Sequence, residues 1–188
     1  MLHKSLVFLV LVVFSSCSNS LTNKEKEDLI VKGKENTEST FKELSSNLME
    51  QMKLGGPKQA IPFCNVQAMP ITDKYSENFN VSIKRTTDKL RNTKNEATKR
   101  ELEIIKKFQS NLQNKIVIKP IVELGNQNKK HFYAPIIVNS KCLSCHGELK
   151  KEVSIKTDSL IKTLYKNDLA IGYKVGDLRG IWSVTFNE

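Results

Sequence analysis

Residues 116–138 read IVIKPIVELGNQNKKHFYAPIIV, and this stretch decides the expected fold. Two segments rich in strand-forming residues, 116–124 and 131–138, flank the turn-forming sequence Gly125-Asn126-Gln127-Asn128. This arrangement predicts a β-hairpin, because glycine and asparagine readily adopt the backbone conformations of tight turns. Pro120 cannot donate a backbone hydrogen bond, so we expect the first strand to lie at a sheet edge or to carry a bulge.

The segments around the hairpin predict further strands and helices. Residues 81–83 and 180–186 have strand character, and residues 68–80 are expected to form a loop. Apolar spacing and turn residues predict four helices: one through Phe41, Leu44, Leu48 and Met52 that ends at Gly55-Gly56-Pro57, one over 57–67, one through Leu102, Ile105, Phe108 and Leu112, and one over 159–165. Thr40 followed by Glu43 predicts a capped start for the first helix, unless the charged residues upstream extend it. The order of elements predicts an α+β fold, an antiparallel sheet with its helices on one side.

The composition allows one domain with a real core. The chain has 188 residues, of which 39% are apolar and 27% charged. Its longest apolar run, residues 6–14, would span roughly 13 Å as a helix, against about 30 Å for the hydrocarbon layer, which excludes a polytopic membrane protein. The formal net charge is +10, but the lysines are scattered and not grouped beside aromatic residues. A solvated surface is therefore expected, with no nucleic-acid partner; attraction to anionic lipid or an acidic partner remains open.

The N-terminus resembles a bacterial lipoprotein signal. A short positive start is followed by the apolar run and by Phe14-Ser15-Ser16-Cys17. We expect residues 1–16 to be removed and Cys17 to be lipidated; an ordinary secretory signal is the alternative. Residues 17–35 are then expected to be a lipid-anchored tether, and residues 36–188 the domain. This predicts a location in the bacterial cell envelope, on the periplasmic side or at the outer membrane.

The chemistry is carried by Cys142-Leu143-Ser144-Cys145-His146. Two thiols three positions apart can each add to a vinyl group of one haem, and the adjacent histidine can then bind the iron. This CxxCH motif predicts one covalent haem c, attached through Cys142 and Cys145 with His146 as iron ligand. One such motif among four cysteines excludes a multihaem cytochrome. The predicted export agrees, because this attachment takes place outside the cytoplasm.

Other interpretations of the motif remain open. A thioredoxin-like redox pair normally follows a strand in a βαβ unit, which is not predicted here. A disulfide would explain two cysteines but not His146. Zinc held by Cys142, Cys145, His146 and Cys64 is the main rival, although adjacent Cys145 and His146 are awkward neighbours on one zinc ion.

The second axial ligand of the iron would decide the function. The residues leave open Cys64, a methionine such as Met69, and His131. Methionine raises the reduction potential and is typical of electron carriers. Cys64 is the cysteine left over once the lipid and the haem are assigned, but it could equally be a buried, inert thiol.

Four segments together resemble a known family. They are AIPFC at 60–64, IKRTTDKLRN at 83–92, HFYAPIIVNSKCLSCHG at 131–147 and IGYKVGDLRGIWSV at 171–184. From about Phe41 to the C-terminus, the chain resembles the Tll-type c-haem domain family, long catalogued as a domain of unknown function. The resemblance implies a PAS-like fold with a covalent haem, and iron ligation by His146 and by Cys64. Members are regarded as redox or gas sensors often fused to signalling modules, for which this chain has no room.

Weaker candidates surround the expected site. Arg85 and Arg91 suit the pairing of haem propionates, although a solvated basic face would explain them as well. Tyr133 precedes the haem turn and could line the pocket or simply belong to the core.

The expected function is a non-enzymatic haem-based redox or gas sensor in which reduction, or a ligand such as NO or CO, breaks the bond to Cys64. A periplasmic electron-transfer cytochrome c is the alternative. A peroxidase-like enzyme ranks lower because His131 is the only histidine available as a base, and a zinc-stapled structural lipoprotein would follow from the zinc interpretation.

Overall fold

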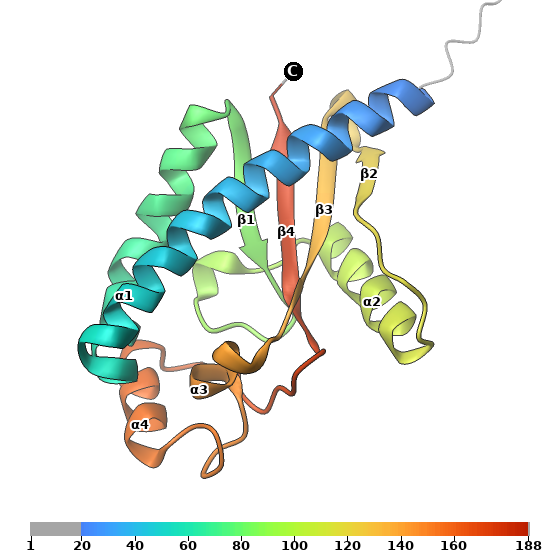
Figure 1. The fold of residues 1–188 in the computed structure, drawn as a ribbon. Coiled ribbons are helices and arrows are strands. Elements are labelled where there is room, and N and C mark those ends of the chain that lie inside the picture. The colour runs from blue at the N-terminus through green and yellow to red at the C-terminus, as the bar shows by residue number, and fades with distance from the viewer. Residues whose placement is uncertain (1–19, 188) are drawn as a thin grey trace, which may run out of the picture.

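The computed structural model describes residues 20–187, which form one antiparallel sheet covered by helices (Figure 1). The strand order is β1-β4-β3-β2, so the last strand of the chain lies in the interior of the sheet. No helix within this part of the chain has the length and hydrophobicity to cross a membrane. In chain order the elements are α1 (Asn23–Asn78), β1 (Val81–Thr86), α2 (Lys99–Gln113), β2 (Ile121–Leu124), β3 (Lys130–Ile137), α3 (Leu143–His146), α4 (Ile155–Leu164) and β4 (Leu178–Phe186).

The predicted hairpin is confirmed. β2 and β3 pair antiparallel, with Ile121 opposite Tyr133, and β2 lies at the edge of the sheet. The turn uses left-handed backbone at Gln127 and Asn128. The first strand is shorter than expected, because it begins directly after Pro120; Val117, before the proline, is 78% exposed.

Helix α1 begins far upstream of Thr40. Thr22 caps it: its hydroxyl accepts from Glu25 N, and the Glu25 carboxylate accepts from Thr22 N at 2.8 Å. Leu21 and Leu29 belong to the buried core, so the described part of the expected tether is instead folded against the sheet. Leu21 and Leu29 are too few to show a helical periodicity in the sequence, but they hold the start of α1 against the core. The predicted signal peptide and Cys17 lie outside the described residues.

A bend divides α1 into two halves that diverge from it like the arms of a V (Figure 1). Gly56 has φ +62° and ψ −154°, a conformation that essentially only glycine adopts, and the helix resumes at Pro57 as predicted. The halves are joined by hydrogen bonds from Tyr75 Oη, at 3.0 Å, and Lys74 Nζ, at 3.3 Å, to the Glu43 carboxylate.

The loop predicted over residues 68–80 is wrong, because the second half of α1 continues to Asn78. Pro70 and the polar composition disfavour a helix locally. Hydroxyls of Thr72 and Ser76 bond to helix carbonyls four residues earlier, and Tyr75 anchors this turn to the first half. Tertiary contacts thus outweigh the local preference.

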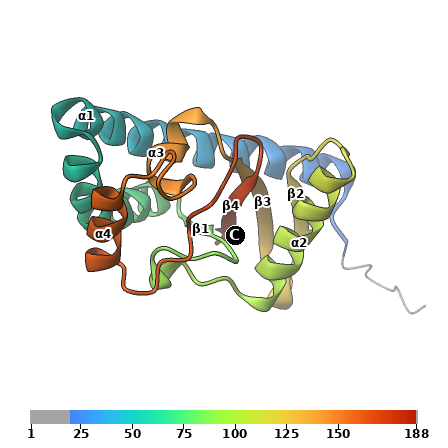
Figure 2. The ribbon, with the colours of Figure 1, turned by 90° about the horizontal axis from the view of Figure 1, so that it is seen from below.

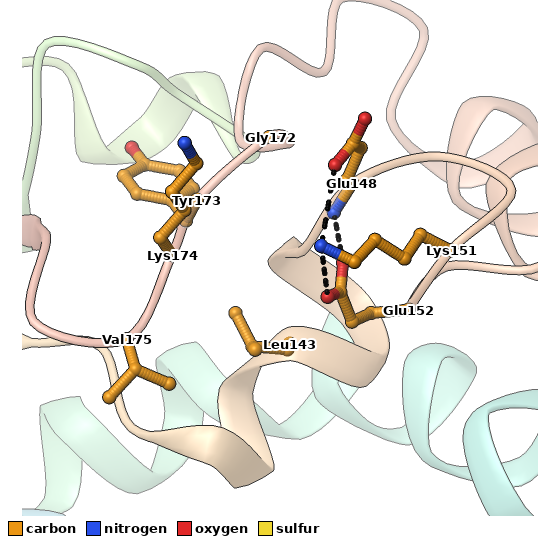
Figure 3. A pocket seen from close by; sticks show the side chains of 8 residues that line it. All are labelled: Leu143, Glu148, Lys151, Glu152, Gly172, Tyr173, Lys174 and Val175. Carbon is orange, nitrogen blue, oxygen red and sulfur yellow. Dashed lines mark hydrogen bonds and ion pairs between the residues drawn. The ribbon is translucent and has the colours of Figure 1, made fainter.

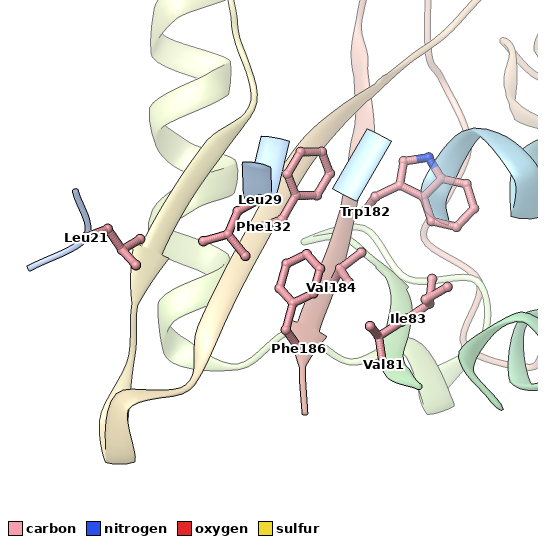
Figure 4. Close-up of a cluster of buried hydrophobic side chains, with 8 residues drawn as sticks. All are labelled: Leu21, Leu29, Val81, Ile83, Phe132, Trp182, Val184 and Phe186. Carbon is pink, nitrogen blue, oxygen red and sulfur yellow. The ribbon is translucent and has the colours of Figure 1, made fainter. Parts of the chain in front are cut away.

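The helices cover both faces of the sheet rather than one (Figure 2). The first half of α1 packs on one face, over a cluster that includes Phe132, Trp182 and Val184 (Figure 4). α2 packs on the other face, where Ile105 and Phe108 are buried with Tyr133, Leu178 and Ile181. Successive strand residues point to opposite faces, which is why neighbours such as Phe132 and Tyr133 belong to different clusters.

Four other predicted elements, two helices and two strands, are confirmed with adjusted ends. The helix through Ile105 and Phe108 is α2, capped by Thr98, whose hydroxyl accepts from Glu101 N. The helix predicted over 159–165 begins earlier, with Ser154 as its cap. Both short strands are longer than expected and pair with each other, Val81 opposite Phe186.

Candidate functional site

The CxxCH motif forms one tight turn after β3. A 3-10 turn (Ser140–Cys142) leads into α3, and the Asn139 side chain caps its start by accepting from Lys141 N at 2.9 Å. α3 stops at Gly147, whose N–H donates to Leu143 O at 2.8 Å. Cys142 and Cys145 are half-buried free thiols, and so is Cys64. The structure therefore gives no support to a disulfide at the motif.

His146 has one ring nitrogen engaged and the other available. Its Nδ1 lies 2.7 Å from Ala170 O; because a carbonyl can only accept, Nδ1 carries the proton. Burial, followed by the charges of Arg91 and Arg179, holds the pKa of His146 well below its usual value. The ring is therefore neutral at neutral pH, with the lone pair on Nε2, the form that binds a metal.

The backbone of the motif is held by the segment 168–173. Tyr173 N donates to His146 O, and Gly172 N donates to Gly147 O, both at 2.9 Å. The Tyr173 ring meets the His146 ring edge-on, with 6.2 Å between centroids. These contacts fix both the position and the orientation of the imidazole.

Arg91 forms hydrogen bonds with both the CxxCH turn and the segment 168–173. Its Nη2 donates to Cys145 O at 2.6 Å and to Ala170 O at 3.2 Å. Its Nε and Nη2 also bond the Asp168 carboxylate at 3.0 and 3.2 Å, and the Asp168 side chain is only 2% exposed. Arg91 thus holds the CxxCH turn in position through backbone carbonyls, a role that the sequence did not predict.

Cys64 lies on the second half of α1 and is half-buried. Burial raises the pKa of the Cys64 thiol, and the charge of Cys145 raises it further, while Arg85 and Arg91 act in the opposite direction. Cys64 is therefore within electrostatic reach of Cys145 and of both arginines. Within residues 20–187, however, no three His, Cys, Asp or Glu residues are grouped closely enough to hold a metal ion, so these residues do not form a zinc tetrahedron.

Two further arginines around the site, Arg85 and Arg179, have no carboxylate within ion-pair distance among the described residues. Arg85 lies over the Trp182 ring at 5.8 Å, and Arg179 lies over the Tyr173 ring at 5.4 Å. Burial lowers the pKa of both guanidinium groups. Neither forms an ion pair with any residue between 20 and 187. The hydrogen bonds found for them go to backbone carbonyls, from Arg85 Nη2 to Ala68 O at 3.5 Å and from Arg179 Nη1 to Lys89 O at 3.4 Å.

The structure does not bring Tyr133, His131 or Met69 to the motif. Tyr133 is buried under α2, because the pleat of β3 turns it to the face away from α1. His131 stacks on Tyr133 at 6.0 Å, and its Nδ1 lies 3.0 Å from the Thr185 hydroxyl. Met69 lines a separate groove. Arg179 is the contributor that the sequence analysis missed, since one arginine after a turn carries no distinguishing pattern.

Two cavities flank the motif. The first, of about 480 Å³, lies beside the turn and is bordered by a small charged network in which Lys151 lies 3.5 Å from Glu152 and 3.7 Å from Glu148 (Figure 3). The second, of about 520 Å³, is the Arg91 groove, between the second half of α1, the segment after Arg91 and the end of α4. The Arg91 groove is lined by Asn65, Val66, Met69, Pro70, Asp73, Arg91, Asn92, Thr93, Lys94, Leu164, Tyr165, Lys166 and Asn167.

The fold and the site define a small α+β domain in which a CxxCH turn faces a cysteine on a bent N-terminal helix. The chain belongs to the Tll0287-like family, whose sequence model matches residues 19–187, so the resemblance noted from the sequence is confirmed. Among solved structures, it is similar to the crystal structure of the cyanobacterial heme-protein Tll0287, with a TM-score of 0.57 and 20% identity over 80% of this chain and 91% of that one. At this identity the likeness shows the fold alone. No curated protein matches the chain.

Proposed function

We propose that this chain is a monohaem c-type haem module that acts as a redox or gas sensor. In this proposal the haem is attached covalently through Cys142 and Cys145, and its iron is ligated by His146 and Cys64. The protein is exported and held in the bacterial cell envelope by lipidated Cys17, on the periplasmic side or at the outer membrane. Membership of the Tll0287-like family, together with the similarity to the cyanobacterial heme-protein, supports haem as the cofactor.

One observation carries the proposal. His146 donates from Nδ1 to Ala170 O at 2.7 Å, in the same turn as two free thiols, so Nε2 remains for an iron. A histidine held in this tautomer by a backbone carbonyl is a well-oriented metal ligand. The donor set of the turn therefore fits a covalent haem.

The charges around Cys64 fit the same group. Arg85 and Arg179 are half-buried and lack carboxylate partners among residues 20–187, which is costly for a guanidinium group. Two haem propionates would supply the missing negative charges through charge-assisted hydrogen bonds. We therefore assign propionate binding to Arg85 and Arg179. Arg91 was also a candidate for this role, but its Nε and Nη2 are engaged by Asp168 and two carbonyls.

Sensing is assigned to the helix that carries Cys64. A bound haem would supply an iron whose preference for thiolate depends on its oxidation state. Burial favours the neutral thiol form of Cys64, so release from iron would be accompanied by protonation. The Gly56 bend separates this half of α1 from the first half, and Tyr75 of the second half packs against the core. Release of Cys64 would thus act on the position of the second half, which Tyr75 links to the first half through Glu43.

The test is an absorption spectrum of the full chain, made with a c-haem maturation system, in ferric and ferrous forms. Wild type is compared with Cys64→Ala and, as a matched control on the same half-helix, Met69→Leu. We expect a ferric thiolate signature that is lost only in Cys64→Ala, and CO binding to the ferrous form. Absence of covalent haem from the wild type would overturn the proposal.

The same experiment decides between sensing and electron transfer. A spectrum unchanged by Cys64→Ala but altered by Met69→Leu would show methionine ligation and favour an electron carrier. An unchanged axial pair in both oxidation states, with no CO binding, would also refute the sensor.

A further inference from the structure

The lining of the Arg91 groove includes neither Cys64 nor any residue of the CxxCH turn. It is built from three segments, namely the second half of α1, the residues after Arg91 and the end of α4. We propose that this groove binds a small organic anion with an apolar body, and that binding is coupled to the CxxCH turn through Arg91. The binding half of this inference stands alone; the coupling half rests on the proposed function.

The lining of the groove has an apolar part and a charged part. Side chains of Val66, Met69, Pro70 and Leu164, with the Tyr165 ring, supply apolar surface. Val66 is 64% exposed, so this part of the wall is accessible from solvent. A cavity with an apolar wall and a few polar groups is the usual form of a small-molecule site.

The charges of the groove favour an anion. Arg91, Lys94 and Lys166 line it, against one carboxylate, Asp73. Neither lysine takes part in an ion pair within residues 20–187, so their charge is available to a ligand. An apolar body with one carboxylate complements this distribution better than a neutral or cationic molecule.

Arg91 connects the groove to the iron ligand. Its Nε and Nη2 are committed to Asp168, Cys145 O and Ala170 O, while no hydrogen bond of Nη1 is found among the described residues. An anion at Nη1 would draw the guanidinium towards the groove and away from Ala170 O. That carbonyl also accepts the Nδ1 proton of His146, so it would become a better acceptor for the imidazole.

The sign of the effect follows from these contacts. A stronger hydrogen bond at Nδ1 makes the imidazole a better donor to ferric iron, and an added negative charge nearby favours the same oxidation state. Both changes lower the reduction potential. Binding of the anion and reduction of the haem are therefore expected to oppose each other.

The experiment uses benzoate as the probe and benzamide as its neutral isostere. Affinity is measured by isothermal titration on the haem-loaded protein, on a Lys94→Gln/Lys166→Gln double variant, and on a Lys106→Gln/Lys107→Gln control, which removes the same charge from exposed positions of α2. We expect benzoate to bind, benzamide to bind about tenfold more weakly, and the groove variant to lose about tenfold in affinity, each about 1.4 kcal/mol. The control variant should match wild type.

The potential is then titrated with and without benzoate. We expect benzoate to lower it in wild type and to have no effect in Arg91→Lys, whose single ammonium cannot serve both sides. Equal binding of benzoate and benzamide, no binding, or an unaffected groove variant would overturn the site. Binding without a change in potential would overturn the coupling. Titration of Cys142→Ala/Cys145→Ala protein, which carries no covalent haem, tests binding even if the proposed function fails.

Discussion

His146 and Arg91 donate to the same carbonyl oxygen, that of Ala170, at 2.7 and 3.2 Å. The proton position on the imidazole therefore depends on a backbone group that a distant arginine also holds. The same arginine bonds Cys145 O, so the cysteine and the histidine of the motif share one support. Asp168 completes it by pairing with Arg91 and by accepting from Ala170 N at 3.0 Å.

Replacing Asp168 by Asn should destabilise the fold by about 3 kcal/mol, because it leaves the buried Arg91 charge without its partner. Urea unfolding measures this loss. The matched control is Asp158→Asn, which removes the partner of Lys162, a lysine that is 59% exposed. Its cost should stay within about 1 kcal/mol. Equal losses in the two variants would show that the Arg91–Asp168 pair has no special structural weight.

The effect of Arg179→Met on stability should change sign when haem is loaded. In haem-free protein the variant removes a half-buried cation that has no ion-pair partner among the described residues, so we expect stability to rise by about 1 kcal/mol. In haem-loaded protein it removes the proposed partner of a propionate, so we expect stability to fall. Urea unfolding of both forms tests this, with Arg100→Met, an exposed position on α2, as the control. A loss of stability in both forms would argue against propionate binding by Arg179.

Gly33→Ala should destabilise the fold by about 1–3 kcal/mol, because a Cβ at this position would overlap the Phe132 ring. At Gly33 the first half of α1 lies directly against the Phe132 ring of β3. The second change in Gly33→Ala/Phe132→Leu makes room for the methyl group, so the double variant should lose less than the sum of the two single variants. Lys34→Ala, at an exposed neighbouring position, is the control. Strict additivity would show that the helix moves away instead.

The sheet could be predicted from sequence because its signals are local. The turn after Leu124 and the strand-forming residues on both sides specify the β2–β3 hairpin without reference to the rest of the chain. The full length of α1 could not be predicted, since its first turns bury only Leu21 and Leu29 and its last turns contain Pro70. Contacts with the sheet and between the two halves stabilise these segments, and such contacts are not written in a local pattern.

For the site, too, local sequence patterns could be recognised, whereas contacts between distant residues could not. CxxCH is a contiguous motif, so its residues could be assigned directly, and Cys64 followed from the family resemblance. Asp168 acts through its contact with Arg91, which lies 77 residues earlier in the chain, and Arg179, over the Tyr173 ring, belongs to no recognisable motif. For Tyr133 the sequence left a pocket role and a core role open, because nearness to the motif in sequence says nothing about the face of β3 on which a side chain lies. The structure places it in the core under α2.

Glu101 should make stability depend on acid pH. Burial acts to raise the pKa of this carboxyl, but hydrogen bonds from Lys84 Nζ and from Thr98 N, both at 2.7 Å, outweigh it and hold the pKa below its usual value. A lowered folded-state pKa means that the contribution is complete above the unfolded-state value, about 4.3, and is lost as the pH falls through the folded-state value. Glu101→Gln should therefore cost about 2 kcal/mol at neutral pH, since hydrogen bonds to a charged group are lost.

Urea unfolding between neutral pH and about pH 3 checks this, because the gap between wild type and Glu101→Gln should narrow as the pH falls. Glu103→Gln is the control, on the same helix but with a side chain that is 49% exposed. Its gap to wild type should be small throughout, as for other surface ion pairs. A gap for Glu101→Gln that stays constant or widens in acid would mean that Glu101 is not held ionised by Lys84 and the cap of α2.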